Sequence, residues 1–111
     1  MISIEIIRDG SGNILGLKSR GHADYAESGN DIVCAAVSML VINSLNAIEQ
    51  FSKTEVKLKA TDQGSGVIDA EFGGIPDEKA QVILDTMLLG LKDTAVRYGK
   101  YLKLIDTIGR R

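Results

Sequence analysis

The sequence is poor in residue types that anchor many small domains. Its 111 residues include no tryptophan, one proline, one cysteine and one histidine, and aromatic residues make up 5%. A single cysteine excludes an internal disulfide framework, and a core with so few rings must consist of aliphatic side chains. With 44% hydrophobic and 25% charged residues, the chain can still build a core. Its length suits a single domain, residues 1–111.

Concentrated positive charge and long apolar runs are also missing. The net charge is −2, and basic residues are scattered apart from Arg110 and Arg111. Phosphate binding normally needs a basic patch, so we expect no direct nucleic-acid partner. The nearly apolar run 32–42 is too short for a membrane span of about 20 residues, and no basic segment typical of a signal peptide opens the chain. We therefore expect a cytoplasmic protein with no membrane partner and a reduced thiol.

Alternating apolar residues and turn chemistry predict a β-hairpin over residues 2–19, because Asp9 to Asn13 is rich in turn formers. A loop follows from Gly21 to Asn30. Asp31 is the expected N-cap of a helix over residues 32–51, whose first three turns are apolar on nearly every side. Such a helix is either central to the fold or partly covered by a second subunit.

The second half of the chain repeats this order of elements. Residues 55–61 and 68–72 alternate and predict another hairpin, with Val56, Leu58 and Ala60 on its apolar side. Asp77 is the expected N-cap of a second helix that ends before Gly99; its apolar stripe comprises Ala80, Ile83, Leu84, Met87, Leu88, Leu91, Ala95 and Tyr98. Residues 101–105 predict a last strand, and residues 106–111 a tail. We predict an α+β fold of order ββαββαβ, with both helices on one face of a mostly antiparallel sheet.

The single histidine and the single cysteine, His22 and Cys34, lie at the two ends of the loop region. If Asp31 is the N-cap, Cys34 lies in the first helical turn, where free N–H groups and the helix dipole favour a thiolate. The same N–H groups could receive an oxyanion. A Cys–His pair within hydrogen-bond reach is an activated nucleophile. Asp24 and Asp31 are the candidates for orienting His22, and Ser38 lies one turn after Cys34 on the same helical face.

Other interpretations of these residues remain open at this point. A lone cysteine in an apolar helix is usually a small core residue, and a lone loop histidine is usually exposed. One alternative is therefore a non-catalytic binding module with a structural Cys34. A thiol sensor is another, although no resolving cysteine is present. The sequence lacks the paired ligands of a zinc site, so we expect no metal and no cofactor.

One stretch of the sequence resembles the signature of a known family. It begins with Gly21-His22-Ala23, continues with a loop that contains Gly29, and ends with Asp31-Ile32-Val33-Cys34-Ala35-Ala36-Val37-Ser38. This stretch is similar to the signature of the bacterial ribosomal-processing cysteine proteases, often called Prp. The length, the leading hairpin and the late helix are also similar to those of this family.

The resemblance implies a homodimeric cysteine peptidase that removes a short N-terminal extension from large-ribosomal-subunit protein twenty-seven, after an aromatic residue. It implies Cys34 as nucleophile and His22 as general base, supported by Asp31, Ser38 and Gly21. The mobile substrate loop would include Ala23, Asp24, Tyr25 and Gly29. Gly21 and Gly29 would let it open, and Tyr25 would close over an apolar recess for the aromatic side chain.

Overall fold

A computed structural model describes residues 1–21, 28–62 and 67–107 of the chain. Two helices and five strands follow one another in the predicted order ββαββαβ. Their bounds are β1 (Ile2–Arg8), β2 (Ile14–Arg20), α1 (Ser28–Phe51), β3 (Val56–Asp62), β4 (Val67–Phe72), α2 (Glu78–Arg97) and β5 (Leu102–Thr107).

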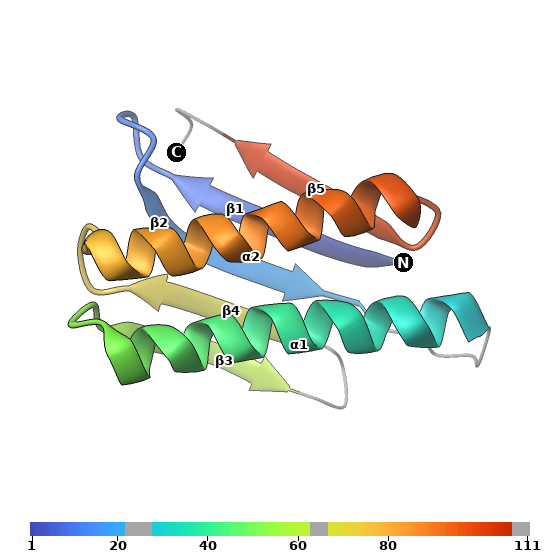
Figure 1. Ribbon diagram of the computed structural model, residues 1–111, viewed down its shortest axis with the longest axis horizontal. Helices are drawn as coiled ribbons and strands as arrows, with labels where there is room; N and C mark the ends of the chain where they lie inside the picture. Colours follow the sequence, from blue (N-terminus) through green and yellow to red (C-terminus); the bar gives the residue numbers. More distant parts are fainter. Residues whose placement is uncertain (22–27, 63–66, 108–111) are drawn as a thin grey trace.

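The five strands form one mixed sheet in the order β3-β4-β2-β1-β5. The pairs β1–β2, β2–β4 and β3–β4 are antiparallel, whereas β5 runs parallel to β1, with Ile2 opposite Leu102. Both helices cover the same face of the sheet and run antiparallel to each other (Figure 1). The fold is therefore the predicted two-layer α+β arrangement, with β3 and β5 as edge strands.

The core lies between the sheet and the two helices and is aliphatic, as the composition requires. Alternate residues of β1 face the helices, while α1 and α2 each contribute one stripe at helical spacing. The buried hydrophobic residues are Ile2, Ile4, Ile6, Ile14, Leu17, Val33, Val37, Val41, Leu45, Ile48, Ala70, Phe72, Ala80, Leu84, Met87, Leu88, Leu91 and Leu102. The predicted stripe of α2 is confirmed except at Tyr98, which follows the helix and is 42% exposed.

The two helices meet where Leu40 of α1 packs against Gly90 of α2. A Cβ atom added to Gly90 would lie 3.0 Å from Cδ2 of Leu40, so the absence of a side chain at Gly90 permits this close approach. On the solvent side of α1, opposite the core, Ile32 and Met39 are 62% and 66% exposed. The stretch Ile32–Phe51 is long and apolar enough to cross a membrane by composition alone. A helix that packs on a sheet and on a second helix passes the same test, and α1 does both.

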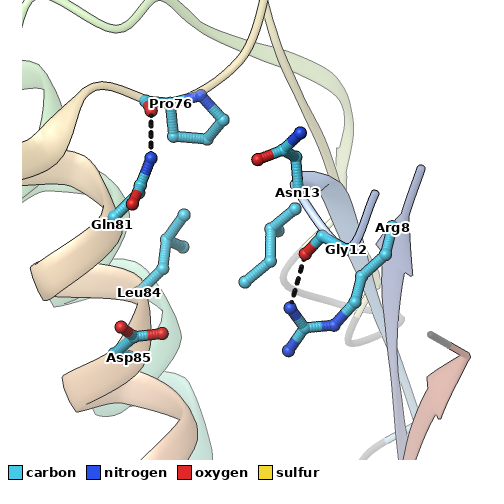
Figure 2. A pocket seen from close by; sticks show the side chains of 8 residues that line it. Arg8, Gly12, Asn13, Pro76, Gln81, Leu84 and Asp85 are labelled. Carbon is cyan, nitrogen blue, oxygen red and sulfur yellow. Dashed lines mark hydrogen bonds between the residues drawn. The ribbon is translucent and has the colours of Figure 1, made fainter. Parts of the chain in front are cut away.

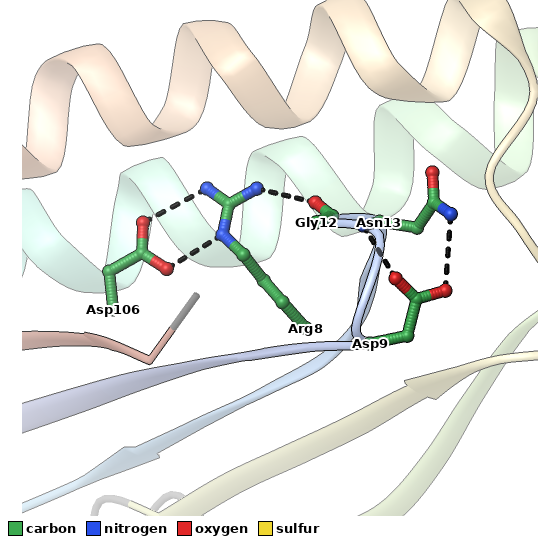
Figure 3. Close-up of polar contacts among 5 residues, drawn as sticks. All are labelled: Arg8, Asp9, Gly12, Asn13 and Asp106. Atoms are coloured by element: carbon green, nitrogen blue, oxygen red, sulfur yellow. Dashed lines mark hydrogen bonds and ion pairs between the residues drawn. The ribbon is translucent and has the colours of Figure 1, made fainter. Parts of the chain in front are cut away.

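The hairpin β1–β2 is tied to β5 by an ion pair (Figure 3). Nε of Arg8 donates to one carboxylate oxygen of Asp106 at 2.7 Å, a second guanidinium nitrogen donates to the other at 2.9 Å, and a third donates to the carbonyl of Gly12. These contacts raise the pKa of Arg8, chiefly through the hydrogen bond to Asp106. Asp106 and Thr107 belong to β5, so the expectation that the last strand ends at residue 105 was wrong. The parallel pairing with β1 extends it, with Ile7 opposite Thr107.

The edge strand β3 departs from the predicted alternation. Its pairing with β4 shifts register between Leu58 and Ala60, which places an extra residue in β3 at that point. Leu58 pairs with buried Ala70 and so lies on the helix-covered face of the sheet, yet it is 56% exposed. Leu58 therefore lies on the predicted apolar side of β3, and it is exposed because the helices leave this part of the edge strand uncovered.

Candidate active site

Cys34 lies deeper in its helix than the sequence suggested. The helix α1 begins at Ser28 and not at Ile32, so Asp31 is its fourth residue and Cys34 its seventh. The expected N-cap at Asp31 was therefore wrong. In an α-helix each N–H beyond the first turn donates to the carbonyl four residues earlier. The backbone N–H of Cys34 therefore donates to the carbonyl of Asn30. The proposed thiolate stabilisation by free first-turn N–H groups does not apply at this position.

The side chain of Cys34 is half-buried and packs against the edge of the hydrophobic core. Its neighbours Val33 and Val37 are buried, whereas Ala35 and Ala36 are exposed. Cys34 therefore lies at the boundary between core and solvent, where a sulfur atom is accessible to one side.

The helical geometry fixes which side this is. Leu40 lies on the flank of α1 that meets α2. With 3.6 residues per turn, the buried positions Val37 and Val41 lie between Leu40 on one flank and Cys34 and Ser38 on the other. Cys34 and half-buried Ser38 thus lie one turn apart on the flank turned away from α2. That flank borders the part of the sheet that ends in β3, which contacts α1.

Gly21 occupies the point where the chain leaves β2 toward α1. Its φ of +92° lies in the left-handed region, and a Cβ atom added there would collide with the carbonyl oxygen of Met1. Only glycine meets both conditions without strain. The end of β2 and the beginning of α1 lie at the same end of the molecule, together with the N-terminus (Figure 1). Gly21 thus lies at the end of the fold that holds the first turns of α1.

The other predicted site residues are placed only in part. His22, Ala23, Asp24 and Tyr25 lie outside the described residues. Gly29, expected in the loop, is the second residue of α1, because the helix begins three residues before the predicted cap. The structure therefore brings together Cys34 and Ser38.

A pocket among the described residues lies at the other end of the molecule, between the β1–β2 turn and the first turns of α2 (Figure 2). Its volume is about 90 Å³; it is lined by Arg8, Gly12, Asn13, Ile14, Pro76, Gln81, Leu84 and Asp85. Ligand sites usually measure roughly 300 Å³ or more, so this pocket suits ordered water better than a substrate. Sequence patterns could not reveal this pocket, because its lining comes from residues 8–14 and 76–85, which are far apart in the chain.

The described part of the chain contains no cluster of side chains suited to bind a metal ion. No group of three or more His, Cys, Asp or Glu side chains could hold an ion among residues 1–21, 28–62 and 67–107. The chemically distinctive group that the structure does place is the thiol of Cys34, with a hydroxyl one turn away.

The chain is similar to proteins of known activity over nearly its whole length. Residues 1–103 match the model of the family described as cysteine protease Prp. The ribosomal processing cysteine protease Prp of Staphylococcus aureus is 32% identical over 104 residues, which cover 94% of this chain and 97% of that protein. The protein of the same description from Bacillus subtilis is 31% identical over 97% of this chain and 99% of its own length.

Solved structures agree with the sequence comparison. The S. aureus protease Prp in complex with a substrate peptide has a TM-score of 0.87 at 30% identity, covering 96% of this chain and all of that one. A second S. aureus structure, with a TM-score of 0.85, holds a covalently linked product peptide. A Streptococcus mutans protein has a TM-score of 0.86 at 32% identity, covering 97% and 95%. The chain therefore belongs to the cysteine protease Prp family.

Proposed function

We propose that the protein is a cysteine endopeptidase in which Cys34 is the nucleophile. The observation that carries this is the position of Cys34 on an accessible flank of α1, toward the end of the molecule where β2 ends and α1 begins. The covalently linked product peptide of the S. aureus relative supports the same chemistry.

The proposed reaction uses His22 as general base. His22 takes the proton of the Cys34 thiol, and the sulfur attacks the carbonyl carbon of the scissile bond. His22 then gives the proton to the leaving amine as the C–N bond breaks, and water hydrolyses the remaining thioester to release the acid and the thiol. Asp24 or Asp31 orients His22 in this scheme, and Ser38 lines the site beside the sulfur.

For the substrate we propose the N-terminal extension of large-ribosomal-subunit protein twenty-seven, cut after an aromatic residue. The printed descriptions of the relatives as ribosomal processing proteases support a ribosomal protein, and the peptide complex of one relative supports an extended segment. The loop with Ala23, Asp24 and Tyr25 is the proposed cover of the bound peptide, which would limit stray proteolysis in the cytoplasm.

We also propose that the protein works as a homodimer in the cytoplasm. The support is the apolar stripe that Ile32, Ala35 and Met39 form on the solvent side of α1. A stripe of this kind on a soluble protein commonly marks a contact with another chain, and a two-fold axis would pair it with its own copy.

The direct test is to incubate a peptide that spans the extension with the protein and with Cys34→Ala, and to read the products by mass spectrometry. We expect one cut after the aromatic residue and none with Cys34→Ala. His22→Ala should lower kcat by at least about a hundredfold and slow the alkylation of Cys34 by iodoacetamide.

Ser44→Ala is the matched control. Ser44 is a buried hydroxyl of the same helix that donates to the carbonyl of Leu40, nearly three turns beyond Cys34. It should leave cleavage unchanged. Tight binding of the peptide by both the protein and Cys34→Ala, with no cut by either, would contradict the peptidase. That outcome would favour the alternative, a non-catalytic binding module of ribosome biogenesis in which half-buried Cys34 only packs against the core.

A further inference from the structure

The small pocket between the β1–β2 turn and the first turns of α2 combines an apolar floor with polar groups (Figure 2). The buried residues Ile14, Pro76 and Leu84 belong to its lining and supply the apolar part. Gln81 and Asp85 of α2 also line it and are exposed, so solvent reaches the pocket from their side. A ligand bound there would meet carbon atoms inside and polar atoms at the opening.

The hydrogen bonds around the pocket leave three groups of oxygen atoms available as acceptors. The side-chain nitrogen of Gln81 donates to the carbonyl of Pro76, and that of Asn13 donates to Asp9, so the amide oxygens of Gln81 and Asn13 remain. Within the described part of the chain, the carboxylate of Asp85 has no hydrogen bond or ion pair. Figure 2 shows Gln81 and Asp85 on α2 facing Asn13 across the pocket.

Arg8 lines the same pocket, but Asp106 compensates its charge. Two nitrogens of its guanidinium donate to the two carboxylate oxygens of Asp106 at 2.7 Å and 2.9 Å, and a third donates to the carbonyl of Gly12. With Asp85, two carboxylates accompany one guanidinium, so the pocket and its surroundings carry an excess of negative charge. This excess favours a cationic ligand over an anionic one.

We propose that this pocket binds the side chain of a lysine of the ribosomal protein substrate, outside the segment that is cut. This inference rests on the proposed function. A lysine carries three donors at the end of an apolar stem, and the pocket offers three acceptor groups beside an apolar floor. Its volume of about 90 Å³ corresponds to roughly three water molecules of about 30 Å³ each. This space suits the ammonium group and the last carbons of the stem and is too small for a whole ligand.

The pocket lies too far from Cys34 to hold a residue beside the scissile bond. Leu40 meets Gly90, and the two helices run antiparallel (Figure 1). Asp85 is therefore level with a point on α1 about eleven residues, or about 16 Å, beyond Cys34. A peptide with four residues on each side of the cut reaches only about 13 Å from the sulfur. The lysine must therefore belong to the body of the substrate, and a protein that binds ribosomal RNA is rich in such cations.

The direct test uses n-butylammonium chloride as a probe for the end of a lysine side chain, with potassium chloride as the salt control. The NMR signals of the side-chain amides of Asn13 and Gln81 report binding. We expect saturable shifts with the unaltered protein and at least about threefold weaker binding by Asp85→Asn. Asp93→Asn is the matched control, because Asp93 is an exposed carboxylate of the same helix that pairs with Arg97; it should bind the probe normally.

A second titration with sodium phosphate tests the opposite charge. Shifts of the same amide signals with phosphate and none with butylammonium would overturn the proposal, since the pocket would then bind anions through Arg8. Thermal unfolding checks that Asp85→Asn and Asp93→Asn fold like the unaltered protein.

Cleavage kinetics then connect the pocket to the substrate. The ratio of kcat/KM for the intact ribosomal protein to kcat/KM for the short peptide should fall about fivefold in Asp85→Asn and stay constant in Asp93→Asn. An unchanged ratio in Asp85→Asn overturns the contact with the substrate and leaves the peptidase intact. Failure of the unaltered protein to cleave either substrate contradicts the peptidase and the substrate lysine with it, and the butylammonium titration distinguishes this outcome from a pocket that binds no ammonium group.

Discussion

At the scale of single residues, Asp77 shows how one carboxylate can organise a junction. It accepts hydrogen bonds from the amide of Ala80 at 2.9 Å, the hydroxyl of Ser52 at 2.8 Å and the amide of Lys53 at 3.0 Å. Its own amide donates to the hydroxyl of Thr54. The hydrogen bond from Ala80 is the largest of the causes that lower the pKa of Asp77 to about 2. Asp77 thus joins the start of α2 to the segment after α1.

This depressed pKa predicts a pH-dependent contribution to stability. An unfolded aspartate has a pKa of about 3.9, so the contribution of Asp77 is complete above that value and is lost as the pH falls toward 2. Asp77→Asn should lower the free energy of unfolding at pH 6, and its difference from the unaltered protein should shrink between pH 5 and 2.5. Urea unfolding at several pH values measures this.

Asp93→Asn provides the comparison for the Asp77 experiment. It removes a carboxylate from an exposed pair with Arg97 on the same helix, where little stability is expected from the contact. A difference for Asp77→Asn that stayed constant from pH 6 to 2.5 would mean that the carboxylate charge does not hold this junction.

At the scale of elements, local patterns predicted the strands and helices well and their ends less well. Asp77 was predicted as an N-cap and is one, whereas the same rule failed at Asp31. An aspartate before an apolar run also fits the first turn of a helix, and α1 begins earlier, at Ser28. Contacts between distant segments were not predictable, because no periodicity links Arg8 to Asp106 or exposes Leu58.

The candidate site was predictable to a similar degree. Cys34 and Ser38 were expected on one helical face and lie one turn apart on it. The expected first-turn position of Cys34 failed with the N-cap at Asp31, and the proposed pairing with His22 stays a prediction. The flank on which Cys34 lies could not be read from the sequence, because it depends on which side of α1 meets Gly90.

The crossing of the two helices yields a prediction about packing. Gly90→Leu should lower the free energy of unfolding by about 1–3 kcal/mol, because the new side chain must displace Leu40. Leu40→Ala should also destabilise, since it removes a partly buried side chain. The double variant should be more stable than the sum of the two changes by at least about 1 kcal/mol. Urea unfolding of all four proteins completes the cycle, and strict additivity would mean that the helices do not meet at these residues.

At the scale of the whole molecule, the helical layer has two unlike sides. One side packs on the sheet, and the other carries the apolar stripe of Ile32, Ala35 and Met39 on α1. The opposite face of the sheet carries charges of both signs in register, with Lys18 between Glu5 and Asp69 on the neighbouring strands. The helical side is therefore the better surface for the proposed association of two copies.

Met39→Asp tests this association. A charge within the stripe should shift the protein from dimer to monomer at micromolar concentration, as measured by sedimentation velocity, because a buried unpaired carboxylate opposes the contact. Leu89→Asp changes a residue of similar exposure on α2 and should leave the sedimentation coefficient unchanged. A monomeric unaltered protein, or a dimeric Met39→Asp, would contradict an interface on this stripe.

The parallel pairing of β1 with β5 also determines when the fold can be completed during synthesis. During synthesis β1 can pair with β2 as soon as both have emerged, but its other edge waits until residues 102–107 have emerged. Until then Arg8 lacks the carboxylate of Asp106, and the apolar side of β1 has no neighbour along that edge. Because such distant contacts form late, nascent chains should become protease-resistant only after residues 102–107 have emerged.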